Sequence, residues 1–110
     1  MSRSRMISIF VSNVSNVVVH MILEKSIEDE YLRKHYNLEY LNFLEISRIY
    51  RRKINPINKS LPEKDVQDIK KKIKIIVANE LKLRISKGYS GIDLDLIDAI
   101  IDKKLKELKI

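Results

Sequence analysis

Apolar residues recur at helical spacing through most of the chain beyond residue 25. In residues 26–54 they form two lines along one predicted helix, about 120° apart around its axis. One line contains Ile27, Tyr31, Leu38 and Ile49, and the other contains Leu32, Tyr36, Phe43 and Tyr50. Residues 61–87 and 92–109 each carry one apolar line with spacings of mostly three and four. The pattern predicts an all-α fold, a small bundle of three principal helices at about 26–54, 61–87 and 92–109.

Capping and helix-breaking signals set these predicted boundaries. Ser26 suits the N-cap of the first helix, and Pro56 ends that helix because the residue before a proline avoids helical backbone. The spacing of Ser60 and Glu63 is that of a capping box at the start of the second helix. Gly88 suits the left-handed residue that follows the end of that helix.

The N-terminal segment does not share the helical pattern. Residues 7–23 are apolar but contain six polar side chains, which makes this stretch too short and too polar for a membrane span. The consecutive valines at 17–19 favour extended backbone. We therefore expect a poorly specified arm at residues 1–23, extended or weakly helical, ahead of one helical domain at residues 24–110.

Two other interpretations of this segment remain open. Basic residues before an apolar stretch are typical of a signal peptide, although no small-x-small cleavage site follows here. Met6 and Met21 are alternative translation starts, in which case the preceding residues carry no structural role.

The composition narrows the classes of function. The 110 residues include no cysteine and only two histidines, which excludes thiol catalysis and zinc ribbons. Two glycines are too few for a Gly-rich phosphate loop, and no nucleophile is paired with a base. The acidic residues of the third helix are interpreted as a solvated first turn rather than a magnesium site: Asp93, Asp95, Asp98 and Asp102. We predict a protein that is not an enzyme and that uses no cofactor, metal or small-molecule substrate.

The positive charge is concentrated in one part of the chain. Of a net charge of +7, residues 46–87 alone carry thirteen Lys/Arg against four Asp/Glu. Clustered basic side chains bind phosphates because each neutralised phosphate releases counterions. The candidate nucleic-acid-binding residues are Arg48, Arg51, Arg52, Lys53, Lys71, Lys74 and Lys82. A solvated basic face is the alternative interpretation.

A helix with two apolar lines usually contacts two neighbours, and one of them can be another protein. The surplus line is the predicted partner-binding surface: Leu32, Tyr36, Phe43 and Tyr50. His35 lies between the two lines and is expected to be a packed structural histidine. Glu80 and Arg84, four residues apart, are expected to form a half-buried ion pair within their helix.

Two families of replication proteins resemble this chain. Its size, basicity and helix content resemble the small helical binding subunit of the crenarchaeal family B DNA polymerase holoenzyme. The run at 80–87, ELKLRISK, followed by the break at 88–91 and an Asp-rich helix, is similar to the helical domain of GINS replication proteins. The similarity covers residues 30–108 loosely, and the small β domain of GINS proteins has no counterpart. Either resemblance implies a non-catalytic role beside DNA, in an archaeal source.

These observations predict a cytoplasmic accessory subunit of a DNA replication complex. It binds a larger protein such as a DNA polymerase, contacts nucleic acid through its basic segment and does not bind membranes. A homodimeric transcriptional regulator or antitoxin, and a ribosome-associated protein, are the alternatives. The many Ile and Lys residues indicate an AT-rich coding bias, and the many Lys and Glu residues with no cysteine are typical of a thermophile protein.

Overall fold

The computed structural model describes residues 1–26, 28–56 and 59–110. Within them the chain forms four α-helices, one short 3₁₀ turn and no strand. The elements in chain order are α1 (Arg3–Ser26), α2 (Glu30–Ile54), α3 (Glu63–Ser86), η1 (Leu94–Leu96) and α4 (Ile97–Glu107). The predicted all-α bundle is confirmed. It contains one helix more than the sequence pattern indicates, because α1 occupies the expected arm.

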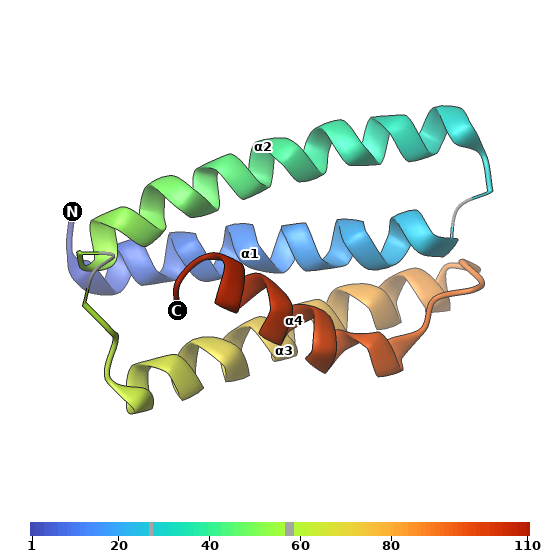
Figure 1. Ribbon diagram of the computed structural model, residues 1–110. Coiled ribbons are helices and arrows are strands. Elements are labelled where there is room, and N and C mark those ends of the chain that lie inside the picture. Colours follow the sequence, from blue (N-terminus) through green and yellow to red (C-terminus); the bar gives the residue numbers. More distant parts are fainter. Residues whose placement is uncertain (27, 57–58) are drawn as a thin grey trace.

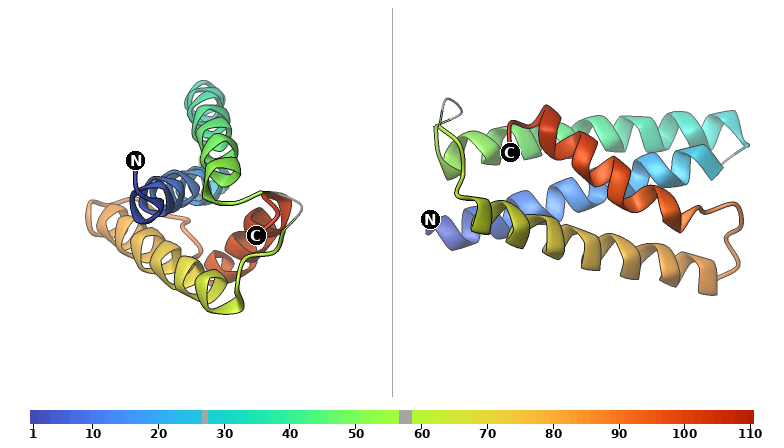
Figure 2. Two further views of the ribbon diagram at one scale, coloured as in Figure 1. Left: turned by 90° about the vertical axis from the view of Figure 1, so that its left-hand side faces the viewer. Right: turned by 60° about the horizontal axis from the view of Figure 1, so that its bottom comes forward.

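The central helix of the bundle is α1. Helices α2 and α3 lie on either side of it, and the shorter α4 crosses the bundle obliquely (Figure 1). Viewed end-on, α2 projects from the bundle away from α3 and α4 (Figure 2). Eight of the twenty buried apolar side chains in the described residues belong to α1: Phe10, Val11, Val14, Val17, Val18, Val19, Ile22 and Leu23. The core is therefore built around the segment with the weakest helical pattern.

The polar side chains of α1 explain why the prediction of an arm is wrong. Ser15 Oγ donates a hydrogen bond to Val11 O at 2.7 Å, and His20 Nδ1 lies 2.8 Å from Asn16 O. Each of these two atoms bonds a carbonyl four residues earlier on its own helix, and that contact satisfies it where the side chain is buried. Apolar residues then cover nearly every side of α1, which is the pattern of a fully buried helix.

The helix starts differ from the predicted ones. Asp29, not Ser26, is the N-cap of α2, and its Oδ1 accepts hydrogen bonds from the backbone amides of residues 31 and 32. Ser26 instead ends α1. The predicted capping box does not form, because α3 begins at Glu63 with Pro62 at the N-cap and no side-chain cap.

The end of α3 is as predicted. Gly88 has a φ of 98°, in the left-handed region that favours glycine. Its N–H donates to Ile85 O at 3.0 Å, and the N–H of Tyr89 donates to Arg84 O at 3.1 Å. These two bonds form a Schellman motif, which satisfies carbonyls that the helix end would leave unpaired.

The expectation that the N-terminal segment is too short and too polar to span a membrane is not met. Among the described helices, α1 alone is long and apolar enough to cross one, by length and composition. Its most apolar 18-residue window has a mean hydropathy of 1.8. In this structure 56 % of that window is buried inside the bundle. A buried core helix and a signal sequence both reach such a hydropathy. The contacts of α1 with α2, α3 and α4 account for its apolar composition without a membrane.

Candidate functional site

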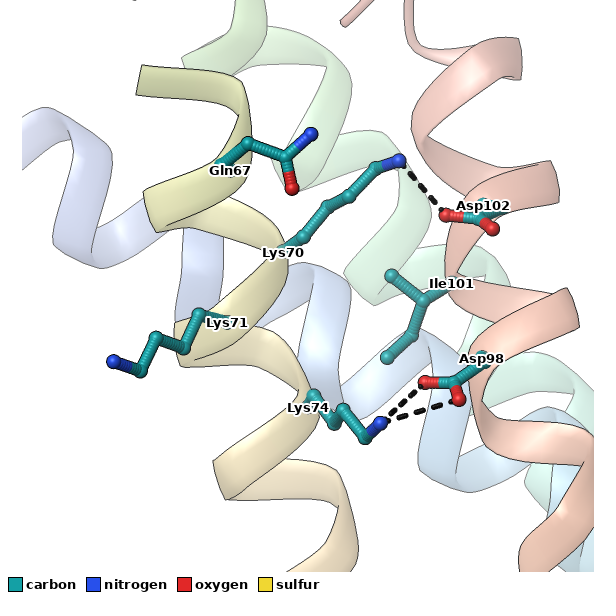
Figure 3. Close-up of a pocket in the computed structure, with 7 residues that line it drawn as sticks. All are labelled: Gln67, Lys70, Lys71, Lys74, Asp98, Ile101 and Asp102. Carbon is teal, nitrogen blue, oxygen red and sulfur yellow. Dashed lines mark hydrogen bonds and ion pairs between the residues drawn. The ribbon is translucent and has the colours of Figure 1, made fainter. Parts of the chain in front are cut away.

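The lysines of α3 divide into two sets. Lys70 Nζ lies 3.0 Å from Asp102 Oδ1, and Lys74 Nζ lies 3.0 Å from Asp98 Oδ1, so both lysines tie α3 to α4 (Figure 3). Lys74, a candidate phosphate contact, thus forms an exposed ion pair with α4 in this structure. Asp98 and Asp102, weighed above as magnesium ligands, serve as the acceptors of these lysines.

The other lysines of α3 point away from α4. Lys71 extends to the opposite side of the helix from Lys70 and Lys74 (Figure 3). Among the described contacts none joins the members of this set to an acidic side chain, and all of them are exposed. We call this set the α3 basic stripe: Lys64, Lys71, Lys72 and Lys82.

Exposed apolar side chains accompany the α3 basic stripe. Ile75 is 52 % exposed and Leu83 is 49 % exposed, and Ile76 lies beside them. Ile75, Ile76 and Lys72 also line a shallow, mostly apolar groove whose other wall is Ser8 and Val11 of α1. Large apolar side chains that remain exposed next to a groove mark surfaces that bind other molecules. We call Ile75, Ile76, Leu83 and the α3 basic stripe together the α3 outer face.

Arg51 is a structural residue and not an exposed cation. Its side chain is 2 % exposed, although it belongs to the predicted phosphate-binding cluster. Nη2 and Nε donate to Lys109 O at 2.8 and 3.2 Å, and Nη1 donates to Asn55 Oδ1 at 2.6 Å and to Asn55 O at 3.2 Å. The guanidinium thereby joins the end of α2 to the C-terminal end of the chain. The prediction that Arg51 contacts phosphate is wrong, because no surface is left for it.

The three other basic residues at the end of α2 are exposed. Arg48 and Arg52 lie on the side of α2 that faces away from α1, and Lys53 Nζ lies 5.0 Å from the centre of the Tyr50 ring. Because α2 and α3 lie on opposite sides of α1, these residues and the α3 basic stripe form two separate surfaces (Figure 1). The predicted basic segment is therefore not one continuous surface.

The two apolar lines of α2 have exchanged the roles expected for them. Tyr36, Phe43 and Tyr50, predicted to bind a partner, are partly buried and pack against the core, while Leu32 is half exposed. In the other line, Tyr31, Leu38 and Ile49 are exposed, and Ile27 lies outside the described residues. A helical wheel cannot decide which of two lines faces the core, because both follow helical spacing.

A buried histidine that the sequence does not single out links α1 to α2. His20 Nε2 lies 2.6 Å from Glu39 Oε2, and its ring is 5.3 Å from those of Tyr36 and Phe43. The two ring nitrogens therefore face oxygen atoms on two helices, the Asn16 carbonyl of α1 and the Glu39 carboxylate of α2. The hydrogen bond from His20 holds the pKa of Glu39 below its ordinary value of 4.5. His35 is not packed as expected: it is exposed, and its Nε2 lies 3.0 Å from Glu39 Oε1.

The remaining titratable groups have structural partners or are solvated. Arg84 Nη1 lies 2.8 Å from Glu80 Oε2, so the predicted half-buried ion pair is confirmed. Asp93 caps η1 by accepting a hydrogen bond from the amide of Asp95. In the described ranges, no group of three or more His, Cys, Asp or Glu side chains is placed to hold a metal ion.

Comparison of this chain with protein-family models, with curated protein sequences and with solved structures gives no match. The surfaces of the molecule are therefore the basis for a functional assignment.

Proposed function

We propose that this chain is a non-enzymatic accessory subunit of a DNA replication complex, which binds a larger protein such as a DNA polymerase in the cytoplasm. The observation that carries the proposal is the α3 outer face, where Ile75, Ile76 and Leu83 remain exposed beside a groove and four lysines. A purely solvated helix face needs no such apolar side chains. The resemblance to helical replication subunits supplies the class of partner.

The lysines of the α3 outer face support a contact with nucleic acid beside the partner. Lys71, Lys72 and Lys82 extend from one side of α3 and have long, mobile side chains. Lysine acts as a point charge towards phosphate and carries no base specificity by itself. The proposed contact is therefore independent of sequence and responds strongly to salt.

The nucleic-acid contact is tested by the salt dependence of duplex DNA binding. We compare the wild-type chain with K71Q/K72Q/K82Q and with a matched control, R48Q/R52Q/K53Q, which removes the same charge from α2. Each lost phosphate contact lowers the slope of log affinity against log salt by about 0.9. We expect the α3 triple variant to lower the slope by about 2 to 3, and the control to leave it nearly unchanged.

Two results would contradict this assignment. A lower slope in the α2 variant alone would place the phosphate contacts on the other side of the bundle. Strong preference for one DNA sequence would favour the alternative of a homodimeric transcriptional regulator or antitoxin, since phosphate contacts alone do not discriminate between sequences.

A further inference from the structure

The outer face of α2, opposite α1, carries seven exposed residues at alternating spacings of three and four. This is the spacing of positions a and d in a heptad repeat, and it places all seven within about 100° of the helix circumference. No described element covers this face, because α2 projects from the bundle and packs on α1 (Figure 2). We call these residues the α2 seam: Tyr31, Lys34, Leu38, Leu41, Glu45, Arg48 and Arg52.

The centre of the α2 seam is apolar. Leu38 is 67 % exposed, Leu41 is 51 % exposed, and Ile49 lies beside the seam nearer the C-terminal end of α2. Leucines at neighbouring a and d positions are what one helix of a coiled coil presents to another. Charged residues flank the two leucines on both sides along the helix, which limits the partners that fit.

The order of residues in the α2 seam is complementary to itself in the reverse direction. If α2 is set antiparallel to a copy of itself with Leu38 opposite Leu41, then Lys34 falls opposite Glu45 and Tyr31 falls opposite Arg48. The central layers are then leucine on leucine, the next layers pair opposite charges, and the outer layers place an arginine on a tyrosine ring. We propose that a second copy of this chain packs antiparallel on the α2 seam and forms a twofold-symmetric dimer.

The charges at the two ends of α2 favour the same arrangement. The N-terminal end carries Glu28, Asp29 and Glu30, and the C-terminal end carries Arg48, Arg52 and Lys53. An antiparallel pair brings each acidic end next to a basic end, whereas a parallel pair places like charges together. Within one chain, Glu45 and Arg48 are only loosely paired, at 3.8 Å, so a second copy does not have to break a strong contact.

The dimer goes beyond the proposed function and leaves the α3 outer face free. Helices α2 and α3 lie on opposite sides of α1, so a copy docked on the α2 seam does not cover Ile75 or Leu83 (Figure 1). The dimer thus presents two α3 outer faces. It also assigns Arg48 to a contact with the Tyr31 ring of the second copy instead of a contact with phosphate.

The pairing of Lys34 with Glu45 is tested by charge reversal in sedimentation equilibrium. K34E and E45K each turn two attractive pairs per dimer into repulsive ones, and we expect each to weaken dimerisation about tenfold. The double variant K34E/E45K restores both pairs in reverse and should recover most of the wild-type affinity. K64E, an equal charge change on α3, is the matched control and should leave dimerisation unchanged.

The antiparallel register is tested by cross-linking, since the chain has no cysteine of its own. In the proposed dimer, the thiol that K34C introduces in one copy lies opposite the thiol that E45C introduces in the other, within reach of a disulfide. The two copies of position 34 are offset by about 17 Å along the helix axis, because eleven residues of helix separate their layers. We expect a mixture of K34C and E45C chains to cross-link and K34C alone not to do so.

Several outcomes would overturn the dimer. The first is a wild-type chain that stays monomeric up to the solubility limit. The second is a double variant K34E/E45K that dimerises no more tightly than the two single variants. The third is efficient cross-linking of K34C alone. The last result would indicate a parallel pair. Circular dichroism of every variant confirms that the helices are intact, as expected for substitutions at exposed positions.

Discussion

The buried Arg51 side chain provides the sharpest test of how the bundle is closed. Truncation by R51A removes the guanidinium that joins α2 to the C-terminal end of the chain. It removes four hydrogen bonds, two to Lys109 O and two to Asn55, together with the buried methylene groups of the side chain. R51M keeps most of the apolar volume and removes only the polar head, so the two variants separate packing from hydrogen bonding.

The expected loss of unfolding free energy follows from these contacts. Hydrogen bonds from a charged donor contribute about 1.5 to 3 kcal/mol each in isolation, but the four bonds share one side chain and are not additive. The two buried methylenes that R51A removes, Cγ and Cδ, contribute about 0.8 kcal/mol each. The cost of desolvating the guanidinium offsets part of this sum, and burial accordingly lowers the pKa of Arg51. We expect R51A to lose about 3 kcal/mol of unfolding free energy and R51M about half of that.

Chemical denaturation measures these differences in unfolding free energy. It is applied to the wild type, to R51A and R51M, and to R52A, a variant of the exposed neighbour. R52A is the matched control and should stay within about 0.5 kcal/mol of wild type. A loss of about 3 kcal/mol corresponds to a decrease in Tm of about 13 °C for a chain of this size. If R51A kept wild-type stability but bound DNA more weakly than R52A did, Arg51 would be an exposed phosphate ligand and the described packing would be wrong.

Three further outcomes are expected from the packing of α1, the pKa of Glu39 and the end of α3. L23A removes a fully buried side chain of α1 and should cost about 2 to 5 kcal/mol in denaturant titrations, whereas an N-terminal arm would tolerate it. The contact with His20 lowers the pKa of Glu39 in the folded protein below its ordinary value of about 4.5. The stability from this contact is therefore fully present above about pH 4.5 and is lost as the pH falls through the lowered pKa. E39Q should flatten this acid limb in a plot of unfolding free energy against pH. G88A should cost about 1 kcal/mol through its positive φ alone, since no atom lies within 4 Å of the added methyl, and a neutral result would mean that the left-handed turn is absent.

The parts of the fold that the sequence predicts are those with a one-sided apolar pattern. Of the apolar line expected in α3, Ile69, Ile73 and Val77 are buried, whereas Ile76 and Leu83 are exposed. The glycine after α3 has the geometry expected of it. Helix α1 was not predictable in this way, because a helix buried on nearly all sides has no polar face to define a period. The hydrogen bonds of its polar side chains to its own backbone could have indicated a helix, since the spacing of Asn16 and His20 permits such a bond.

The candidate site was predictable only in part, for a related reason. A sequence locates basic residues but does not show their neighbours, so Lys71 and Lys74 look alike although Lys74 faces Asp98 and Lys71 faces solvent. The burial of Arg51 depends on Lys109, fifty-eight residues away along the chain. The choice between the two apolar lines of α2 depends on where α1 lies. That information is absent from the local pattern of α2.

Whether the α3 outer face binds a replication protein is measured most directly by co-purification with quantitative mass spectrometry from the native source. Tagged wild-type chain is compared with I75E/L83E, which places carboxylates on the α3 outer face, and with L38E/L41E, which makes the matched change on the α2 seam. We expect a DNA replication protein to co-purify with the wild-type chain and with L38E/L41E but not with I75E/L83E. Equal recovery of that protein with all three chains, or recovery of no replication protein with any of them, would contradict the assignment.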